Sequence, residues 1–352
     1  MTQEEILLRK SLRNGKTFTP FVDEIDISPN QKEVVSAPLW SKNQAALTSV
    51  FTSSAQSVNQ KRYYYELYNS QSNLQGAESQ FSIAYGDSVG SGSATGSAGQ
   101  NVYDYPTKAV YAQYRQMLLS SGDNLFTFSG GETSEYIYVI NVNRARFKDR
   151  MDTKTWQLTI SGSGFITLID DSTTTTTELA QQGGRVFNVR SGSIANGIYT
   201  ADTTPWGLFY PDRGVIVLNG QALDASASFN TQRVPATGSG FDNALKLFTS
   251  ISGAMASSVS RSFQGRTSEV ISSTYYFVRM FNGEYNYTTN NSFVSGSTGV
   301  LKYDSMVRDP QVYVTSIGLY DDNQELLAVA KMSKPVKKSF DRELVIKVKL
   351  DY

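Results

Sequence analysis

Histidine and cysteine are both absent from the 352 residues of this chain. Histidine is the commonest general acid or base near neutral pH, and cysteine is the most reactive nucleophile at that pH. Their absence excludes a Ser-His-Asp or Cys-His mechanism, disulfide bonds and a zinc site built from the usual ligands. Catalysis would have to use a carboxylate pair, a lysine, a tyrosine or a metal bound by oxygen atoms. We therefore predict that the protein is not an enzyme and that it has no catalytic residues, no metal and no cofactor.

Charge is sparse as well. Only 18% of the residues are charged, and 32 basic residues balance 32 acidic ones, whereas about a quarter of an average protein is charged. Without a basic excess we predict no nucleic-acid partner. A net charge of zero suits a subunit held in an assembly better than a free, concentrated protein. Tyrosine is frequent, at 21 residues, and this residue is typical of broad protein–protein interfaces.

Long hydrophobic runs are also missing. No stretch reaches the length of a membrane-spanning helix. The first five residues, Met-Thr-Gln-Glu-Glu, are acidic where a secretory signal would be basic. We therefore predict neither a secretion signal nor insertion into a membrane.

The N-terminal residues 2–14 have the pattern of a short amphipathic helix. Thr2 and Glu5 form a capping-box pair, and acidic residues at the start and basic residues at the end match the helix dipole. One stripe of this helix is apolar and consists of Ile6, Leu7, Leu8 and Leu12. The stripe predicts packing either on the protein's own body or on a neighbouring subunit. Residues 16–60 show little periodicity, so we predict that residues 1–60 form an N-terminal helix and an extended arm.

Most of the remaining chain has the alternating pattern of β-strands. Helical spacing appears only at 107–120 and 242–263. The pattern predicts a mainly β fold, with one or more antiparallel β-sandwiches, a few short helices and the extended N-terminal arm. We expect one main β-sandwich domain from residues 61–171 and 266–352. Residues 172–265 are expected to form a second, inserted β-rich domain with one helix.

The last strand is the best-patterned segment of the chain. Four apolar residues of this strand alternate with polar residues or valine, so they are expected to face the core. They are Leu344, Ile346, Val348 and Leu350. The strand that begins near residue 325 is expected to break at Pro335, since proline cannot donate to a β-ladder.

Two acidic clusters and one basic run are candidates for a site. The acidic clusters are Asp170-Asp171 and Asp321-Asp322-Asn323. Neither has the residue order of a calcium loop, so we interpret both as turns rather than cation sites. The basic run is interpreted either as a contact to an acidic partner or as a solvated surface. Its members are Arg144, Arg146, Lys148 and Arg150.

The C-terminal residues carry a resemblance to a known group of proteins. The run Ile-Gly-Leu-Tyr-Asp at 317–321 is followed by Glu-Leu-Leu-Ala-Val-Ala-Lys at 325–331 and by a closing strand at 345–352. Three segments in the middle of the chain contribute to the same resemblance, namely residues 81–86, 111–115 and 138–146. Together these segments resemble virion structural proteins of T-even-like myophages, notably those of cyanobacterial hosts. The size and β content are most similar to the peripheral baseplate wedge proteins, and the resemblance covers about residues 60–150 and 310–352.

This resemblance implies a structural subunit of a bacteriophage contractile-tail baseplate that acts by protein–protein assembly. It implies other baseplate and tail proteins as partners, a homodimer, synthesis in the host cytoplasm and a final place in the virion. A neck, collar or capsid-surface protein is an alternative within the virion. A receptor-binding module for host glycans is an alternative of another class, because tyrosine and amide side chains also suit sugar binding. A tail-associated glycan hydrolase is a third class.

Overall fold

The computed structural model describes most of the chain beyond its N-terminal segment. The described residues are 27–52, 63–71, 73–92, 106–173, 179–195, 198–199, 204–233, 242–258, 260–287, 292–295 and 297–352. The protein is mainly β, with 46% strand, short helices and antiparallel sheets, which confirms the predicted fold class. The chain divides into two units, and Val34–Val270 forms the larger of them. Met1–Glu33 and Ile271–Tyr352 form the smaller one.

The larger unit is built on one curled antiparallel sheet of 13 strands. Its main path runs through β2 (Ala46–Leu47), β17 (Phe263–Gln264), β10 (Gln157–Ser161), β11 (Phe165–Asp170), β13 (Gly184–Ser193), β15 (Gly207–Tyr210), β16 (Val215–Asn219), β8 (Tyr136–Val142), β5 (Ser79–Asp87), β4 (Tyr64–Tyr68) and β3 (Phe51–Thr52). Two further strands, β12 (Leu179–Gln181) and β14 (Ile198–Tyr199), pair with β13. A separate small ladder joins β6 (Phe126–Thr127) to β7 (Thr133–Ser134).

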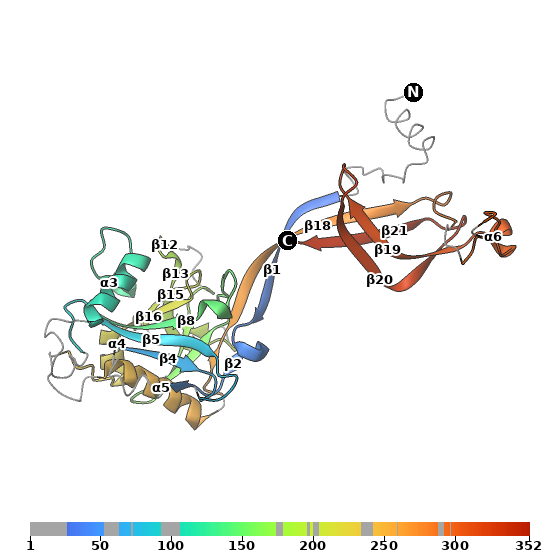
Figure 1. Ribbon diagram of the computed structural model, residues 1–352. Helices are drawn as coiled ribbons and strands as arrows, with labels where there is room; N and C mark the ends of the chain where they lie inside the picture. Colours follow the sequence, from blue (N-terminus) through green and yellow to red (C-terminus); the bar gives the residue numbers. More distant parts are fainter. Residues whose placement is uncertain are drawn as a thin grey trace. The chain divides into compact units, whose positions relative to one another are not determined.

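Both faces of this sheet are buried, which explains why its central strands are almost continuously apolar. In β8, Tyr138 and Ile140 belong to one core, and Ile137 and Val139 belong to the other. Helix α3 (Pro106–Leu118) covers the second core, whereas α4 (Gly220–Ala227) and α5 (Asn243–Ser257) cover the first. Figure 1 shows α3 on one side of the sheet and α5 on the other. The two predicted helices at 107–120 and 242–263 therefore exist, with the second ending earlier than expected.

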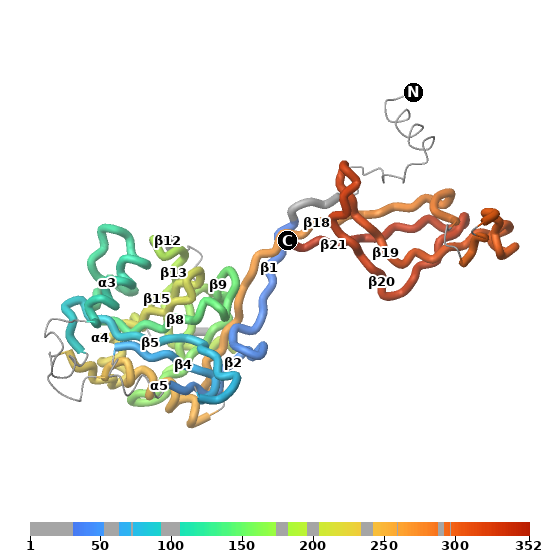
Figure 2. The backbone as a smooth tube through the Cα atoms, in the orientation of Figure 1, coloured from blue at the N-terminus to red at the C-terminus, as the bar shows by residue number. Residues whose placement is uncertain are grey.

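The smaller unit contains two thin sheets. The first follows the order β1 (Ile27–Pro38), β18 (Arg266–Met280) and β21 (Leu344–Asp351). Strands β1 and β18 continue into the larger unit, where β9 (Arg150–Met151) pairs with β18. Figure 2 shows β1 beside β18 along the chain trace. The second sheet is a hairpin of β19 (Val312–Tyr320) and β20 (Leu326–Lys338), and α6 (Ser305–Arg308) precedes it.

The division into units differs from the predicted domains. Residues 172–265 do not form an inserted domain, because β13, β15 and β16 lie inside the same sheet as β8 and β10. The segment 271–352 belongs to the smaller unit instead of joining residues 61–171. A local pattern of alternating residues shows that strands form, but it does not show which distant strand each one pairs with.

The predicted arm also needs correction over its described part. Residues 27–38 form a long strand, and Leu39, Trp40 and Leu47 are buried in the core of the larger unit. The indole of Trp40 donates to the carbonyl of Phe263 at 2.7 Å. These residues are therefore an integral part of the fold rather than an arm on its surface. The predicted helix at 2–14, with Ile6, Leu7, Leu8 and Leu12, lies outside the described residues.

Strand β20 does not end at Pro335 as predicted but continues to Lys338. The pairing with β19 shifts register between Val314 and Ser316, so the proline falls in a bulge where no ladder donor is needed. The last strand has the predicted alternation, since Val348 is buried and Lys347 and Lys349 are exposed. Leu344, Ile346 and Leu350 are only half-buried, however. This burial shows that the smaller unit has a thin core.

Candidate functional site

The predicted basic run lies at the end of β8, in the 3-10 turn η4 (Arg144–Arg146) and the residues after it. Arg146 forms an ion pair with Glu78 at 2.9 Å, and Lys148 forms one with Glu269 at 2.7 Å. Both positive charges are therefore compensated by acidic residues of the same chain.

The other two members of the run are also held by the protein itself. Arg144 donates to the carbonyl of Phe147 at 2.9 Å and lies over its ring at 4.6 Å. Arg150 is half-buried in β9, opposite Ser268 of β18. These contacts favour a structural role for the run, and its role as a contact to an acidic partner stays a prediction.

The acidic pair at the end of β11 accepts hydrogen bonds from its surroundings. The carboxylate of Asp170 accepts from the backbone N–H of Lys154 at 3.1 Å and from the hydroxyl of Ser172. Asp171 accepts from the backbone and side chain of Asn188 at 2.9 and 2.7 Å. Both carboxylates are thus used to close turns. Within the described ranges no three acidic residues come together as a potential metal site.

Burial raises the pKa of Asp170, while the hydrogen bonds from Ser172 and Lys154 act in the opposite direction. A carboxyl whose pKa is higher in the folded state stabilises the protein at low pH, and this contribution is lost as the pH rises through the folded pKa. The Asp170→Asn variant lacks this titration. We therefore expect the difference in free energy of unfolding, variant minus parent, to become more positive as the pH rises from about 4 to about 7. Urea denaturation at several pH values measures this difference. A difference that stays constant or falls over this range would contradict the assignment.

The second acidic cluster forms the turn of the β19–β20 hairpin. The carboxylate of Asp321 accepts from the backbone N–H of Glu325 at 2.7 Å. The side chain of Asn323 donates to the other oxygen of Asp321 at 3.5 Å. This arrangement agrees with the interpretation of the cluster as a turn.

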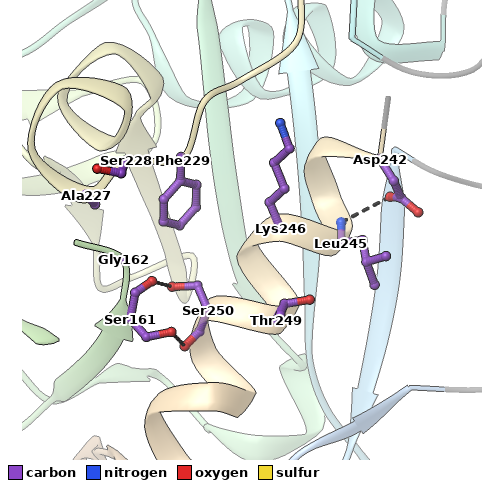
Figure 3. Close-up of a pocket in the computed structure, with 10 residues that line it drawn as sticks. All are labelled: Ser161, Gly162, Ala227, Ser228, Phe229, Asp242, Leu245, Lys246, Thr249 and Ser250. Carbon is purple, nitrogen blue, oxygen red and sulfur yellow. Dashed lines mark hydrogen bonds between the residues drawn. The ribbon is translucent and has the colours of Figure 1, made fainter. Parts of the chain in front are cut away.

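A cavity of about 480 Å³ lies between α5, the end of α4 and the β10–β11 turn. In Figure 3, Ser161 and Ser250 face each other across its wall. Each serine hydroxyl donates to the backbone carbonyl of the other residue, at 2.8 and 2.5 Å. Asp242 caps α5 by accepting from the N–H of Leu245 at 3.1 Å. These bonds hold a helix to a hairpin, and none of them joins a nucleophile to a base.

Gly162 permits the close packing at this cavity, since a Cβ atom there would lie 2.0 Å from the carbonyl oxygen of Ala227. We expect Gly162→Ala to lower the free energy of unfolding by about 1–3 kcal/mol through overpacking. Gly164 is in the same turn with no atom within 4 Å of an added Cβ, so Gly164→Ala is the matched control and should be nearly neutral. Urea denaturation compares the two variants. Equal stabilities would show that α4 can move away from the turn.

The strongest polar cluster joins β5 to a segment that is distant in sequence. Asp87 is fully buried at the end of β5 and forms an ion pair with Arg233 at 2.8 Å. Its other oxygen accepts three backbone N–H groups, those of Val89, Gly90 and Ser91, at 3.0–3.2 Å. Arg233 also forms an ion pair with Glu135 at 2.8 Å. Sequence patterns did not identify this cluster, because nothing local links residue 87 to residue 233.

The smaller unit exposes an unusual amount of apolar surface. Among its described residues, only Met280, Met306 and Val348 are buried apolar side chains. Its exposed large apolar residues are Phe281, Tyr285, Tyr287, Phe293, Val300, Leu301, Tyr303, Val307, Tyr313, Tyr320, Leu326, Leu327, Val329, Phe340, Val345 and Tyr352. Exposed apolar groups in this density are typical of protein–protein contact surfaces. This surface is the candidate functional site.

The chain matches no protein-family model, no curated protein and no solved structure. No helix within the described part of the chain is long and apolar enough to span a membrane.

Proposed function

We propose that this protein is a structural subunit of a bacteriophage contractile-tail baseplate, a wedge component that acts by binding other tail proteins. The observation that carries the proposal is the exposed apolar surface of the smaller unit. A domain with so few buried side chains gains stability when a partner covers its surface, because burial of apolar area is the main favourable term in association. The likeness of residues 312–352 to tail proteins supports the choice of assembly.

The connection between β18 and β19 carries several of these exposed side chains among its described residues. Tyr287 is 73% exposed, Tyr303 53% and Val307 66%. We name the described residues of this connection, 281–287, 292–295 and 297–309, the distal segment and propose that it contacts a neighbouring tail protein. Tyrosine is enriched at the centre of interfaces because it combines a large apolar area with a hydroxyl that can form a hydrogen bond.

The larger unit has the properties of a rigid body in such an assembly. Its sheet is covered on both faces, and Trp156 and Trp206 are almost completely buried. The ion pair between the buried Asp87 and the half-buried Arg233 joins β5 to a distant loop. A closely packed unit of this kind moves as a whole, and baseplate rearrangements of the rigid-body type require such units.

Immunoelectron microscopy of phage particles, with antibodies against the purified chain, tests the position in the virion. Labelling at the tail end supports the proposal, whereas labelling of the capsid or the neck overturns it. Chemical cross-linking within intact particles then identifies the neighbours. If the chain instead lies on the host-facing surface of the particle and binds host glycans, the result favours a receptor-binding module.

A matched pair of variants tests the distal segment. Val307→Asp places a charge on the proposed contact surface, and Val34→Asp does so at a similarly exposed residue of the larger unit, since these valines are 66% and 63% exposed. Because an unpaired charge in an interface costs several kcal/mol, we expect Val307→Asp to reduce incorporation into particles at least tenfold relative to Val34→Asp. Equal incorporation would show that the distal segment makes no contact.

A further inference from the structure

The turn that follows β18 contains an asparagine and a glycine in sequence, Asn282 and Gly283. The N–H of Glu284 donates to the carbonyl of Phe281 at 3.1 Å and closes the turn around these two residues. Both are exposed, and a Cβ atom added to Gly283 would have no atom within 4 Å. Among the described residues, neither the side-chain amide of Asn282 nor the N–H of Gly283 has a hydrogen-bond partner. These two groups are therefore free to approach each other.

The carbonyl oxygen of Asn282, in contrast, accepts two hydrogen bonds. One comes from the ammonium group of Lys338 at 3.0 Å, and the other comes from the side-chain amide of Asn286 at 2.7 Å. Lys338 and Asn286 are only 0 and 5% exposed, so water does not weaken these bonds. The ammonium group also donates to the side-chain oxygen of Asn286 and to the carbonyl of Ser339, at 3.0 and 3.1 Å. It is thus fixed against the peptide group that joins Asn282 to Gly283.

We propose that Asn282 is a site of spontaneous deamidation and that Lys338 accelerates this reaction. The N–H of Gly283 gives its proton to water, and the nitrogen forms a bond to Cγ of Asn282. The bond from Cγ to the side-chain nitrogen breaks, and that nitrogen takes up a proton and leaves as ammonia. Water then opens the resulting cyclic imide at one of its two carbonyl groups. In total, asparagine and water become aspartate or isoaspartate and ammonia.

The structure favours the first step of this reaction, and this argument does not depend on the proposed role in a tail. Glycine has no Cβ atom to obstruct the approach of its nitrogen and adopts many backbone conformations. When Gly283 loses its proton, negative charge moves onto the carbonyl oxygen of Asn282. Lys338 and Asn286 already donate to this oxygen, so they stabilise the charge as it develops. We therefore expect the reaction to be faster in the folded chain than in the unfolded chain.

The reaction also changes the distal segment. Opening of the imide at the main-chain carbonyl gives isoaspartate, which inserts one carbon atom into the backbone between residues 282 and 283. The free carboxylate of this product is formed from the carbonyl group that Lys338 contacts. In the unmodified turn the ammonium group donates only to uncharged oxygen atoms. A carboxylate accepts a stronger, charge-assisted hydrogen bond, so Lys338 stabilises the product as well.

A second asparagine–glycine pair, Asn219 and Gly220, is an internal control. Asn219 is fully buried, and its side-chain oxygen accepts from the N–H of Gln221 at 3.1 Å at the start of α4. A Cβ atom added to Gly220 would lie 2.2 Å from the ring of Tyr136, so the backbone is closely packed here. Neither group can move to close an imide in the folded protein. In the unfolded chain, both pairs have the same local chemistry.

Peptide mapping by mass spectrometry measures the conversion at both sites. The full chain is incubated at neutral pH, either folded in buffer or denatured in guanidinium chloride. We expect Asn282 to react about tenfold faster in the folded chain than in the denatured chain, because one oriented donor to a developing charge has at least this effect. Asn219 should react only in the denatured chain. A rate at Asn282 that is equal or lower in the folded chain would overturn the proposal.

A pair of lysine variants tests the role of the ammonium group. Lys338→Met removes it, and Lys334→Met removes an exposed lysine of the same strand as a control. In buffer, we expect the rate at Asn282 to fall about tenfold in Lys338→Met and to stay unchanged in Lys334→Met. In guanidinium chloride both variants should react like the parent. An unchanged or higher rate in Lys338→Met would show that Lys338 does not promote the reaction. The comparison of folded and denatured parent chain tests the proposal even if this variant does not fold.

Discussion

Replacement of Asp87 by alanine is expected to lower the free energy of unfolding of the larger unit by about 3–5 kcal/mol. The change leaves the half-buried Arg233 without the buried one of its two acidic partners and removes the acceptor of three backbone N–H groups. Unpaired donors in a buried position cost about 1–3 kcal/mol each. All three tryptophans, at 40, 156 and 206, lie buried in the larger unit. Their fluorescence during urea denaturation therefore reports this unit alone.

Glu135 provides the control for this prediction, because it pairs with the same arginine at the same distance of 2.8 Å but is 53% exposed. An exposed ion pair contributes about 0–1 kcal/mol, so Glu135→Ala should have a small effect. If the Asp87→Ala and Glu135→Ala variants were equally stable, burial of the carboxylate would not be the reason for its importance.

Deletion of residues 344–352 is expected to unfold the smaller unit and leave the larger one intact. Strand β21 pairs with β18 at eight positions, from Ser273–Asp351 to Met280–Leu344. The deletion removes this ladder and Val348, and burial of one such side chain contributes about 1.5–3 kcal/mol. A unit with so few buried side chains has little stability to spare. We expect the amide protons of β18 to exchange with solvent much faster, while the tryptophan fluorescence transition stays unchanged.

A single exposed residue of β21 serves as the control. Lys347 lies with its ammonium group 3.8 Å from the centre of the Tyr275 ring. Lys347→Ala removes this contact, which contributes about 0.5–1 kcal/mol, and it keeps the ladder. Hydrogen exchange in β18 should therefore remain slow. Fast exchange in this variant, or slow exchange after the deletion, would contradict the assigned role of the strand.

Prediction from sequence was most successful where a signal is local. The last strand, β21, and the helices α3 and α5 were expected from residue periodicity, because side chains on one face of an element share one environment. The acidic clusters were correctly interpreted as turns, since Asp and Asn side chains bond to their own neighbouring backbone. The absence of histidine and cysteine restricted the possible chemistry before any segment was considered.

The domain boundaries could not be obtained in the same way. Strands β16 and β8 are neighbours in the sheet although more than 70 residues separate them in sequence. Periodicity assigns each strand a buried face but gives no partner, so residues 172–265 could be mistaken for a separate domain. Leu39 and Trp40 were placed in an arm for the same reason, because their contacts lie far along the chain.

The sequence by itself determined that the protein is mainly β, where many of its strands and turns lie, and which common catalytic groups are missing. Only the tertiary structure decided that the buried Asp87 pairs with Arg233, that Gly162 lies against Ala227, and that the apolar residues of the hairpin are exposed. The physical reason is that alternation depends on neighbours in sequence, whereas burial depends on which distant surfaces meet. A segment that is apolar on both faces looks the same in sequence whether the fold covers both faces, as in β8, or leaves one uncovered, as in residues 326–330 of β20.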